Sequence, residues 1–491
     1  MDRLYLFFDN EFTYYAHAMA TWFKRDFGLS DASFRGMIIH RYYMDFLRNR
    51  QTDIKYGELA MWQDLFWQAK TEPPDLEFLQ QVENDWDIDT LWRLRDADRS
   101  IDSFDYAQVL SVMAIFLKYY HKEFTEHRPD AVICFVVASL GAMACYYVAR
   151  HLGIPFLLWD MPRLPGETLI TDNPFNQFPA VDAKYLALLD TPDIALLERA
   201  TAFIDSFREK PAPPGGSHRV LQILGKQSSL HPRRVIGLAR VTYWYYFSHN
   251  REDVGSNPPF KIALDTLKFR WRKEFFARKR PFETAAPNDE QYAFFPLHYQ
   301  PESTTMVLAP YYLDQLALVE NVARSLPVRM KLYVKEHLTM VGQRPFNYYE
   351  RLKRIPNVRL IDPHISSFDV TRKAAIVVTI TGTVGWEALL LRVPVITFGQ
   401  VFYNTLDWVR KCRAIEDLPA LVRDCLENER HEEHRLRAYV AALMSESFEF
   451  DLDQVSDTQR TYEAVRDSPE ASTFYREFCR KLRELKPQLT I

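Results

Sequence analysis

The segment Thr379-Ile-Thr-Gly-Thr-Val-Gly-Trp-Glu-Ala388 carries the strongest structural signal in this sequence. An apolar strand over Ile376–Thr379 runs into a turn of threonine and glycine, and the pattern predicts a helix over residues 384–391 after it. A β-branched strand at residues 393–398 comes next. Strand, helix and strand in this order predict a βαβ unit with parallel strands.

The same alternation extends on both sides of this unit. Further strands are expected at 292–297, 330–335 and 358–360, with helices at 314–325, 346–354 and 367–373. A separate βαβ unit is predicted by a buried strand at 130–137, a helix at 139–152 and a strand at 154–159. Residues 14–123 have mostly helical patterning, with one strand near 36–40, and a loop is expected at 160–176. The fold class is therefore α/β, with two Rossmann-like domains.

Domain boundaries follow from chain length and composition. A chain of 491 residues is long for one domain, and Lys210-Pro-Ala-Pro-Pro-Gly-Gly-Ser217 has the composition of a linker. We expect an N-terminal Rossmann-like domain with a helical insertion at 1–209 and a basic helical linker at 210–290. A C-terminal Rossmann-like domain at 291–430 and C-terminal helices at 431–491 complete the expected organisation.

Charge and cysteine content exclude several classes of function. The net charge of −4 gives no reason to expect nucleic acid as a partner. Five widely spaced cysteines without a CxxC pair argue against a zinc site and favour a reducing, cytoplasmic location. Since no run of about 18 apolar residues exists, we expect no transmembrane helix, and any work at a membrane would be done from its surface.

The turn between Thr379 and the following helix has the features of a phosphate site. Gly382 and Gly385 are expected to let the backbone approach a ligand closely. Free N–H groups and the helix dipole would favour an anion, and Thr381 and Thr383 would add hydroxyls. Glu387, one turn into the helix, is a candidate for accepting hydrogen bonds from ribose. The alternative is an ordinary strand–turn–helix with a threonine cap.

Two further candidate groups follow other strands of this domain. Lys335 and His337 come at the end of an apolar strand, where ligands of open α/β sheets bind, and both could donate to phosphate oxygens. Ser366 or Ser367 is expected to be the N-cap of the next helix. Capping and ligand binding are compatible, because a helix N-terminus in a cleft can do both.

Together these motifs resemble the capsule polysaccharide biosynthesis protein family. The resemblance is specific over residues 295–403. It rests on Phe295-Pro-Leu-His-Tyr-Gln-Pro-Glu-Ser303, Tyr333-Val-Lys-Glu-His337, Gly342-Gln-Arg344, Tyr348-Tyr349, Ile355-Pro-Asn-Val358, Ile361-Asp-Pro363, Ser366-Ser367, Thr379-Ile-Thr-Gly-Thr383, Trp386-Glu-Ala388, Pro394-Val-Ile396, Phe398-Gly399 and Phe402-Tyr403. The family includes bacterial transferases of 3-deoxy-manno-octulosonic acid (Kdo).

The resemblance implies a GT-B fold, in which the two Rossmann-like domains face each other across a cleft. The C-terminal domain would bind a nucleotide sugar, often CMP-linked in this family. His337 matches a histidine that contacts the donor phosphate, although Leu338 stands where the family has proline. The matching positions imply that Ser366, Ser367, Thr381, Gly382 and Thr383 contact phosphate or nucleotide and that Glu387 contacts ribose. No metal and no further cofactor are expected, and the acceptor would be a polysaccharide or glycolipid.

A glycosyltransferase of this kind also needs a carboxylate base from the N-terminal domain. Asp9 and Glu11 follow a short apolar run at 4–8 that predicts a first strand, and Asp160 follows the predicted strand at 154–159. With His337, these carboxylates are the candidates for catalytic residues. For each carboxylate the alternative is that it caps a turn.

The segment Lys268-Phe-Arg-Trp-Arg-Lys-Glu-Phe-Phe-Ala-Arg-Lys-Arg280 has three interpretations. As an amphipathic helix it could lie on an anionic membrane surface, which would make the protein peripheral at the inner face of the cell membrane. As a basic face it could bind an anionic acceptor. The third interpretation is a solvated helix between domains with a few buried aromatic side chains.

The predicted function is transfer of a sugar from a nucleotide-activated donor to a capsular or surface polysaccharide. A nucleotide-sugar epimerase of the same fold is one alternative, although it would need a richer set of acid and base residues. The other is a non-catalytic protein of GT-B type that binds polysaccharide and assists its assembly.

Overall fold

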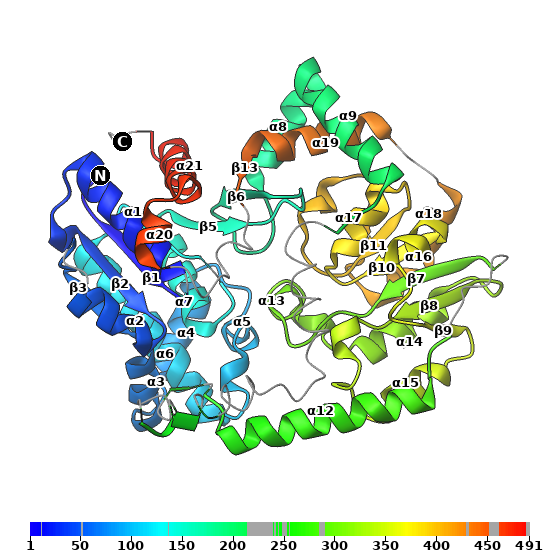
Figure 1. Cartoon of the computed structure of the whole chain (residues 1–491), viewed down its shortest axis with the longest axis horizontal. Helices are drawn as coiled ribbons and strands as arrows, with labels where there is room; N and C mark the ends of the chain where they lie inside the picture. The colour runs from blue at the N-terminus through cyan, green and yellow to red at the C-terminus, as the bar shows by residue number, and fades with distance from the viewer. Residues whose placement is uncertain are drawn as a thin grey trace. The chain divides into compact units, whose positions relative to one another are not determined.

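The computed structural model describes residues 1–10, 12–50, 53–135, 137–213, 239, 242–243, 245–247, 253–254, 256–283, 290–428, 432–450 and 461–487. The chain divides into two compact units (Figure 1). Unit 1 comprises Met1–Pro174, Thr242–Ser256 and Ser447–Ile491, and unit 2 comprises Phe175–Val241 and Asn257–Glu446. Each unit has its own mainly parallel sheet, which confirms the predicted α/β class with two Rossmann-like units.

The described part of unit 1 contains a seven-stranded sheet in the order β13-β6-β5-β4-β1-β2-β3. Five neighbouring strands are parallel, namely β3 (Glu58–Met61), β2 (Phe34–Ile38), β1 (Leu4–Phe8), β4 (Ala131–Ile133) and β5 (Phe156–Asp160). Two antiparallel strands extend the sheet beyond β5, namely β6 (Glu167–Thr171) and β13 (Ser447–Glu449). The loop expected at 160–176 therefore contains a strand, and β3 is a second strand that the sequence pattern did not predict.

Helices cover both faces of this sheet. The side chains of strand β1 show this arrangement. Leu4, Leu6 and Phe8 belong to one hydrophobic cluster, whereas Tyr5 and Phe7 make edge-on and tilted contacts with aromatic rings of α6 on the opposite face. Successive side chains of a strand point to opposite faces. The helices of the N-terminal part are α1 (Phe12–Phe27), α2 (Arg41–Asp45), α3 (Trp62–Thr71), α4 (Leu76–Asp85), α5 (Trp92–Asp96), α6 (Tyr106–His127) and α7 (Leu140–His151).

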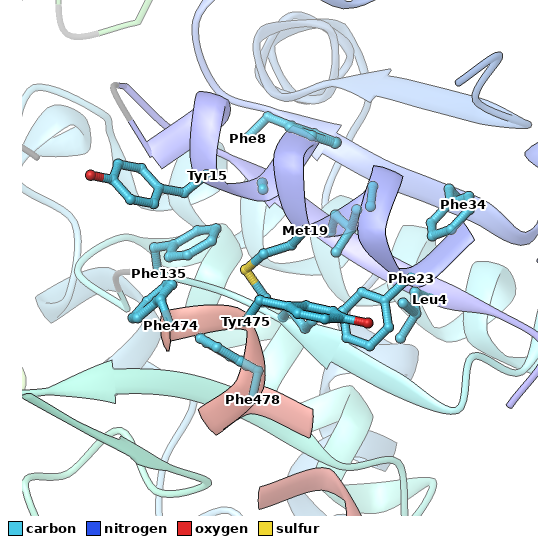
Figure 2. Close-up of a cluster of buried hydrophobic side chains, with 14 of the residues drawn as sticks. Leu4, Phe8, Tyr15, Met19, Phe23, Phe34, Phe135, Phe474, Tyr475 and Phe478 are labelled. Carbon is cyan, nitrogen blue, oxygen red and sulfur yellow. The ribbon is translucent and has the colours of Figure 1, made fainter. Parts of the chain in front are cut away.

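The end of the chain returns to complete the core of unit 1. Helices α20 (Tyr462–Arg466) and α21 (Pro469–Leu485) follow β13, and Phe474 and Phe478 of α21 are buried against Phe135 and the α1 side chains (Figure 2). Full burial of one such ring is worth roughly 1.5–3 kcal/mol. The final helix therefore belongs to unit 1, whereas the sequence analysis treated residues 431–491 as an appended segment.

The described part of unit 2 contains a six-stranded sheet in the order β12-β11-β10-β7-β8-β9, and every pairing in it is parallel. Its strands are β7 (Tyr292–Pro296), β8 (Lys331–Lys335), β9 (Val358–Ile361), β10 (Ile376–Thr379), β11 (Val395–Thr397) and β12 (Val409–Lys411). Continuous β-branched and aromatic runs form these strands because both faces of the sheet are covered.

The helices of unit 2 include two that the sequence analysis assigned to the N-terminal domain. Helices α8 (Pro179–Asp190) and α9 (Ile194–Glu209) pack against α19 (Glu433–Glu446), and Arg208 makes a bidentate ion pair with Glu433 at 2.7 and 3.1 Å. The boundary between units therefore lies at Pro174, not near 209. The other helices are α12 (Pro259–Lys279), α13 (Ser303–Met306), α14 (Gln315–Ser325), α15 (Tyr348–Lys353), α16 (Ser367–Lys373), α17 (Thr383–Leu390) and α18 (Leu418–Glu427).

Candidate functional site

The topology of unit 2 places its candidate residues at a switch point of the sheet. From the adjacent central strands β7 and β10, the strand order runs outward through β8 and β9 on one side and through β11 and β12 on the other. Ligands of open α/β sheets bind outside the carboxyl ends of the strands at such a point. His298 comes two residues after β7, and Thr381 comes two residues after β10.

A hydrogen bond joins these two strand ends. The backbone N–H of Thr381 donates to Nε2 of His298 at 3.2 Å, and the N–H of Gly382 donates to Oγ1 of Thr379 at 3.1 Å. Two of the N–H groups that the sequence analysis expected to be free are therefore bound within the protein. In the described part of the chain, the N–H groups of Thr383 and Val384 meet no protein acceptor, and they form the remaining donor pair at the start of α17.

The glycines of this turn make room for side chains of the protein. A Cβ on Gly382 would lie 2.8 Å from Thr379 Oγ1 and 3.1 Å from His298 Nε2, and a Cβ on Gly385 would overlap the hydroxyl of Tyr403. That hydroxyl donates to the carbonyl of Gly382 at 2.7 Å. That these glycines also let the backbone approach a ligand stays a prediction. The turn needs glycine because His298 and Tyr403 pack against it.

His298 is a buried, neutral imidazole. Burial lowers its pKa to about 4, and the interactions with His337 and with the charge of Arg344 act in the same direction. Because Nε2 accepts a hydrogen bond, the proton is on Nδ1, and this buried atom makes no hydrogen bond of standard geometry. The backbone of His298 is held by Gln315, whose side-chain amide binds both its N–H at 2.7 Å and its carbonyl at 3.1 Å.

A buried ion pair supports the loops on either side. Arg344 Nε lies 2.9 Å from Oε2 of Glu336, and the side chains are 8% and 0% exposed. Arg344 also donates to the carbonyl of His298 at 3.0 Å, while Glu336 accepts from the hydroxyl of Tyr349 at 3.0 Å and from the N–H of His337 at 2.9 Å. One ion pair thus holds the segments after β7 and after β8 in fixed positions.

Lys335 and His337 lie at this same edge, as predicted. Burial lowers the pKa of Lys335, and the carboxylates of Asp362, Glu336 and Glu387 oppose that shift. Burial also lowers the pKa of His337, and Lys335 adds to the effect. The predicted phosphate and ribose ligands Lys335 and Glu387 are therefore close enough to interact, although one follows β8 and the other belongs to α17.

Thr339 sets the orientation of the His337 ring. Its Oγ1 lies 2.7 Å from His337 Nδ1. When the hydroxyl donates to Nδ1, the ring proton is on Nε2, which is then a donor for an anion. When the hydroxyl accepts instead, Nε2 has a lone pair and cannot donate.

The other site residues predicted for unit 2 are Ser366, Ser367, Thr381 and Thr383. Ser366 is exposed at the N-cap position of α16, and Ser367 is the first residue of that helix, but neither side chain makes a capping hydrogen bond. Helix α16 packs against α17. The hydroxyl of Thr381 is used within the protein, because it donates to the carbonyl of Thr304 at 2.6 Å. Thr383 is partly exposed at the first position of α17.

Two of the carboxylates predicted for unit 1, Asp9 and Asp160, lie at the carboxyl edge of its parallel strands. Asp9 follows β1, and its Oδ1 is 3.4 Å from Nε2 of His40, which follows β2. Asp160 is the last residue of β5 and accepts the N–H of Met161 at 2.7 Å. Glu11 lies outside the described residues. Asn10, between Asp9 and Glu11, has a φ of 44°, a left-handed conformation that turns the chain sharply.

Sequence reasoning missed His298, Thr339 and His40 as candidates. A signal for His298 was present, because it stands in the motif at residues 295–303 and follows a strand by two residues, as Thr381 does. Among the described residues, no group of three or more His, Cys, Asp or Glu side chains is arranged to hold a metal ion. No helix in the described ranges is long and apolar enough to cross a membrane.

Comparison with known proteins identifies a family for part of unit 2. Residues 285–409 match the family described as capsule polysaccharide biosynthesis protein, which confirms the predicted resemblance over that segment. No curated protein matches the chain.

Solved structures with a similar arrangement of elements include two transferases and several epimerases. The beta Kdo 2,7 transferase of Thermosulfurimonas dismutans KpsC is 12% identical, with 74% of this chain and 89% of that chain covered and a TM-score of 0.36. The beta Kdo 2,4 transferase of the same protein is 15% identical, with 64% and 79% covered and a TM-score of 0.30. The UDP-GlcNAc 2-epimerase of Neisseria meningitidis, bound to UDP-GlcNAc, is 12% identical, with 91% and 98% covered and a TM-score of 0.24.

Proposed function

We propose, since residues 285–409 match the family described as capsule polysaccharide biosynthesis protein, that the chain is a glycosyltransferase that moves a sugar from a nucleotide-activated donor to a capsular or surface polysaccharide. The observation that carries this proposal is that Lys335, His337 and the first N–H groups of α17 share the carboxyl edge of the unit 2 sheet. Cationic side chains and helix N-termini are the groups that bind phosphate.

In the proposed reaction an acceptor hydroxyl attacks the anomeric carbon of the donor, and the bond from that carbon to the phosphate oxygen breaks. The nucleotide leaves with additional negative charge. Lys335 and the Nε2–H of His337 would stabilise this charge, together with the N–H groups of Thr383 and Val384. Because these groups supply the positive potential, we propose that transfer needs no metal, and that addition of a chelator leaves the rate unchanged.

Glu387 is proposed to bind the ribose. It is 6% exposed and lies close enough to Lys335 to oppose the shift of its pKa. A carboxylate there can accept hydrogen bonds from two vicinal hydroxyls. Ser366 and Ser367 are proposed as further contacts to the nucleotide, because both are at the start of α16 and their hydroxyls make no capping bond. CMP is the nucleotide that the resemblance favours.

The proton of the acceptor hydroxyl would go to a carboxylate of unit 1. Asp9 is the preferred base because the neighbouring His40, with its Nε2 3.4 Å away, can orient the carboxylate. Asp160 is the alternative at the same sheet edge. We propose a cytoplasmic location, which the five buried cysteine thiols support.

The first experiment measures nucleotide binding by thermal unfolding. CMP, UDP and GDP are titrated separately into the wild-type chain, His337→Ala and the control His434→Ala, which changes an exposed histidine of α19 in the same unit. We expect one nucleotide to raise the Tm of the wild type and of the control, and to have little effect on His337→Ala. Failure of all three nucleotides to raise the Tm would exclude the donor site and favour a non-catalytic protein.

The second experiment tests transfer. Release of nucleotide from a nucleotide sugar should depend on an oligosaccharide acceptor and should be lost in Asp9→Asn. Conversion of the free nucleotide sugar to an isomer without an acceptor would instead identify an epimerase.

A further inference from the structure

One face of helix α12 packs against the rest of unit 2. Phe276 is 3% exposed and its ring packs edge-on against Tyr349 at 4.8 Å between ring centroids. Gly342 has a φ of 95°, and a Cβ there would lie 3.0 Å from the backbone carbonyl oxygen of Phe269 and 3.0 Å from Cβ of Lys273. The helix backbone is therefore held tightly against the turn at Gly342, on the side that carries Phe269 and Phe276.

The opposite side of α12 carries an exposed apolar stripe. Phe260, Leu264, Leu267 and Trp271 are 65%, 50%, 63% and 66% exposed. Their spacing of four, three and four residues places all of them on one face of a helix. The stripe is about 17 Å long at 1.5 Å per residue, with aromatic rings at its two ends and leucines between them. A soluble surface rarely leaves such a row uncovered.

Basic side chains border the stripe. Lys261 and Lys268 follow one edge and Arg270 follows the other, since successive residues are about 100° apart around the axis. Arg272 lies nearer the face packed against unit 2, where its Nη1 donates to the carbonyl of Gln343 at 3.1 Å. Seven lysines and arginines and only two acidic residues, Asp265 and Glu274, lie on α12. Because aromatic rings occupy both the packed and the exposed face of α12, the sequence pattern of the segment Lys268–Arg280 did not distinguish the two faces.

We propose that this stripe, with its basic borders, docks α12 in the plane of an anionic lipid surface. Leucine and aromatic side chains would enter the boundary between headgroups and acyl chains, while lysine and arginine reach the lipid phosphates. A nucleic acid would match the charge but offers no apolar layer for the leucines. A second copy of the chain would bring two basic helices together, and like charges repel. The proposal does not depend on the activity proposed above.

The test uses flotation of the full chain with vesicles of phosphatidylcholine alone or mixed with phosphatidylglycerol. We expect the chain to float with the mixed vesicles, to do so less at high salt, and to remain free of the vesicles without phosphatidylglycerol. The double variant Leu264→Ser/Leu267→Ser should lower the partition coefficient at least about tenfold. Lys268→Gln/Arg270→Gln should lower it as well, through charge alone.

The matched control is Leu186→Ser/Ile194→Ser, which removes two exposed apolar side chains of the same unit, 60% and 71% exposed, from α8 and α9. This control should float like the wild type. An equal loss of flotation in Leu264→Ser/Leu267→Ser and in the control Leu186→Ser/Ile194→Ser would overturn the proposal. Equal partitioning of the wild type onto both kinds of vesicle would overturn it as well. Loss of a concentration-dependent dimer in Leu264→Ser/Leu267→Ser would overturn it in favour of an interface between copies. The nucleotide-induced rise in Tm should be the same in all these variants, so a failure of the lipid proposal is separable from a failure of the donor site.

Discussion

His298 Nε2 accepts the backbone N–H of Thr381 across 3.2 Å, and this bond joins two segments that are 83 residues apart in the chain. It closes the switch point of the unit 2 sheet, where β7 and β10 lie side by side. The turn that leads into α17 is therefore held by a side chain from the neighbouring strand end, and its geometry depends on that imidazole being neutral.

Two replacements of His298 should separate the contribution of its hydrogen-bond acceptor to stability from that of its ring. His298→Leu leaves the Thr381 N–H buried without a partner, which costs about 1–3 kcal/mol in the free energy of unfolding. His298→Gln keeps an acceptor near the position of Nε2 and should lose less. Urea unfolding of both variants measures the difference, and equal losses would show that the hydrogen bond contributes nothing to stability.

Thr339 should control nucleotide affinity through the His337 tautomer. Thr339→Val removes the hydroxyl that can donate to Nδ1 and should raise the nucleotide Kd about fivefold to tenfold, which corresponds to roughly 1 kcal/mol. Thr339→Ser restores the hydroxyl and should restore the affinity. Isothermal titration checks this. An unchanged Kd in the valine variant would show that Thr339 has no part in nucleotide binding.

Gly385 and Tyr403 should be coupled in stability. Gly385→Ala forces a methyl group onto the Tyr403 hydroxyl, and we expect a loss of about 1–3 kcal/mol from overpacking. In the background of Tyr403→Phe the oxygen is absent, so the same alanine should cost less. A double-mutant cycle by urea unfolding gives the coupling, and strict additivity would mean that the overlap is relieved elsewhere.

Breaking the buried ion pair between Arg344 and Glu336 should lower the free energy of unfolding. Arg344→Met leaves the carboxylate of Glu336, which is 0% exposed, without its cation, and we expect a loss of about 3–5 kcal/mol. The double variant Glu336→Gln/Arg344→Met removes the uncompensated charge and should recover part of that loss. Because Glu336 also holds the N–H of His337, the double variant should still bind nucleotide more weakly than the wild type.

Acid should destabilise both units through buried histidines. Burial lowers the pKa of His17 in α1 and of His298 to about 4 each, whereas an unfolded histidine has a pKa of about 6.5. Between these values the unfolded chain binds more protons than the folded one, so stability falls as the pH drops from about 6.5 toward about 4. Each histidine contributes up to about 3 kcal/mol to this loss, and neither contributes above the upper value.

Urea unfolding across that pH range measures the acid effect. His298→Gln should flatten the pH dependence of the unit 2 transition, and the exposed control His434→Ala should leave it unchanged. An equally steep dependence in His298→Gln would assign the proton uptake to other groups.

The strands of unit 2 were predictable because each is a continuous apolar run between polar turns, as in Val377-Val-Thr379 or Leu332-Tyr-Val334. Lys335 and His337 were found for the same reason, since the end of a parallel strand marks the ligand edge. Strands β3 and β6 were missed because they are short and, at Glu58 and Glu167, begin with charged residues.

The contacts between distant segments were not predictable from local pattern. A glycine beside a phosphate and a glycine beside an imidazole have the same sequence signature, so the packing of His298 against Gly382 could not be predicted. C-terminal helices were expected at 431–491, but nothing in their local pattern identified α1 and β4 as the partners of α21.

The return of the C-terminal segment to unit 1 has a consequence for synthesis of the protein. Unit 2 has left the ribosome entirely once residue 446 has emerged, whereas the core around Phe135 still lacks Phe474 and Phe478. The unit that is made first must therefore finish folding last. At about 5–20 residues per second, the face of β1 and α1 that α21 covers is exposed for many seconds during translation, so the nascent N-terminal half needs protection from aggregation until α21 has been made.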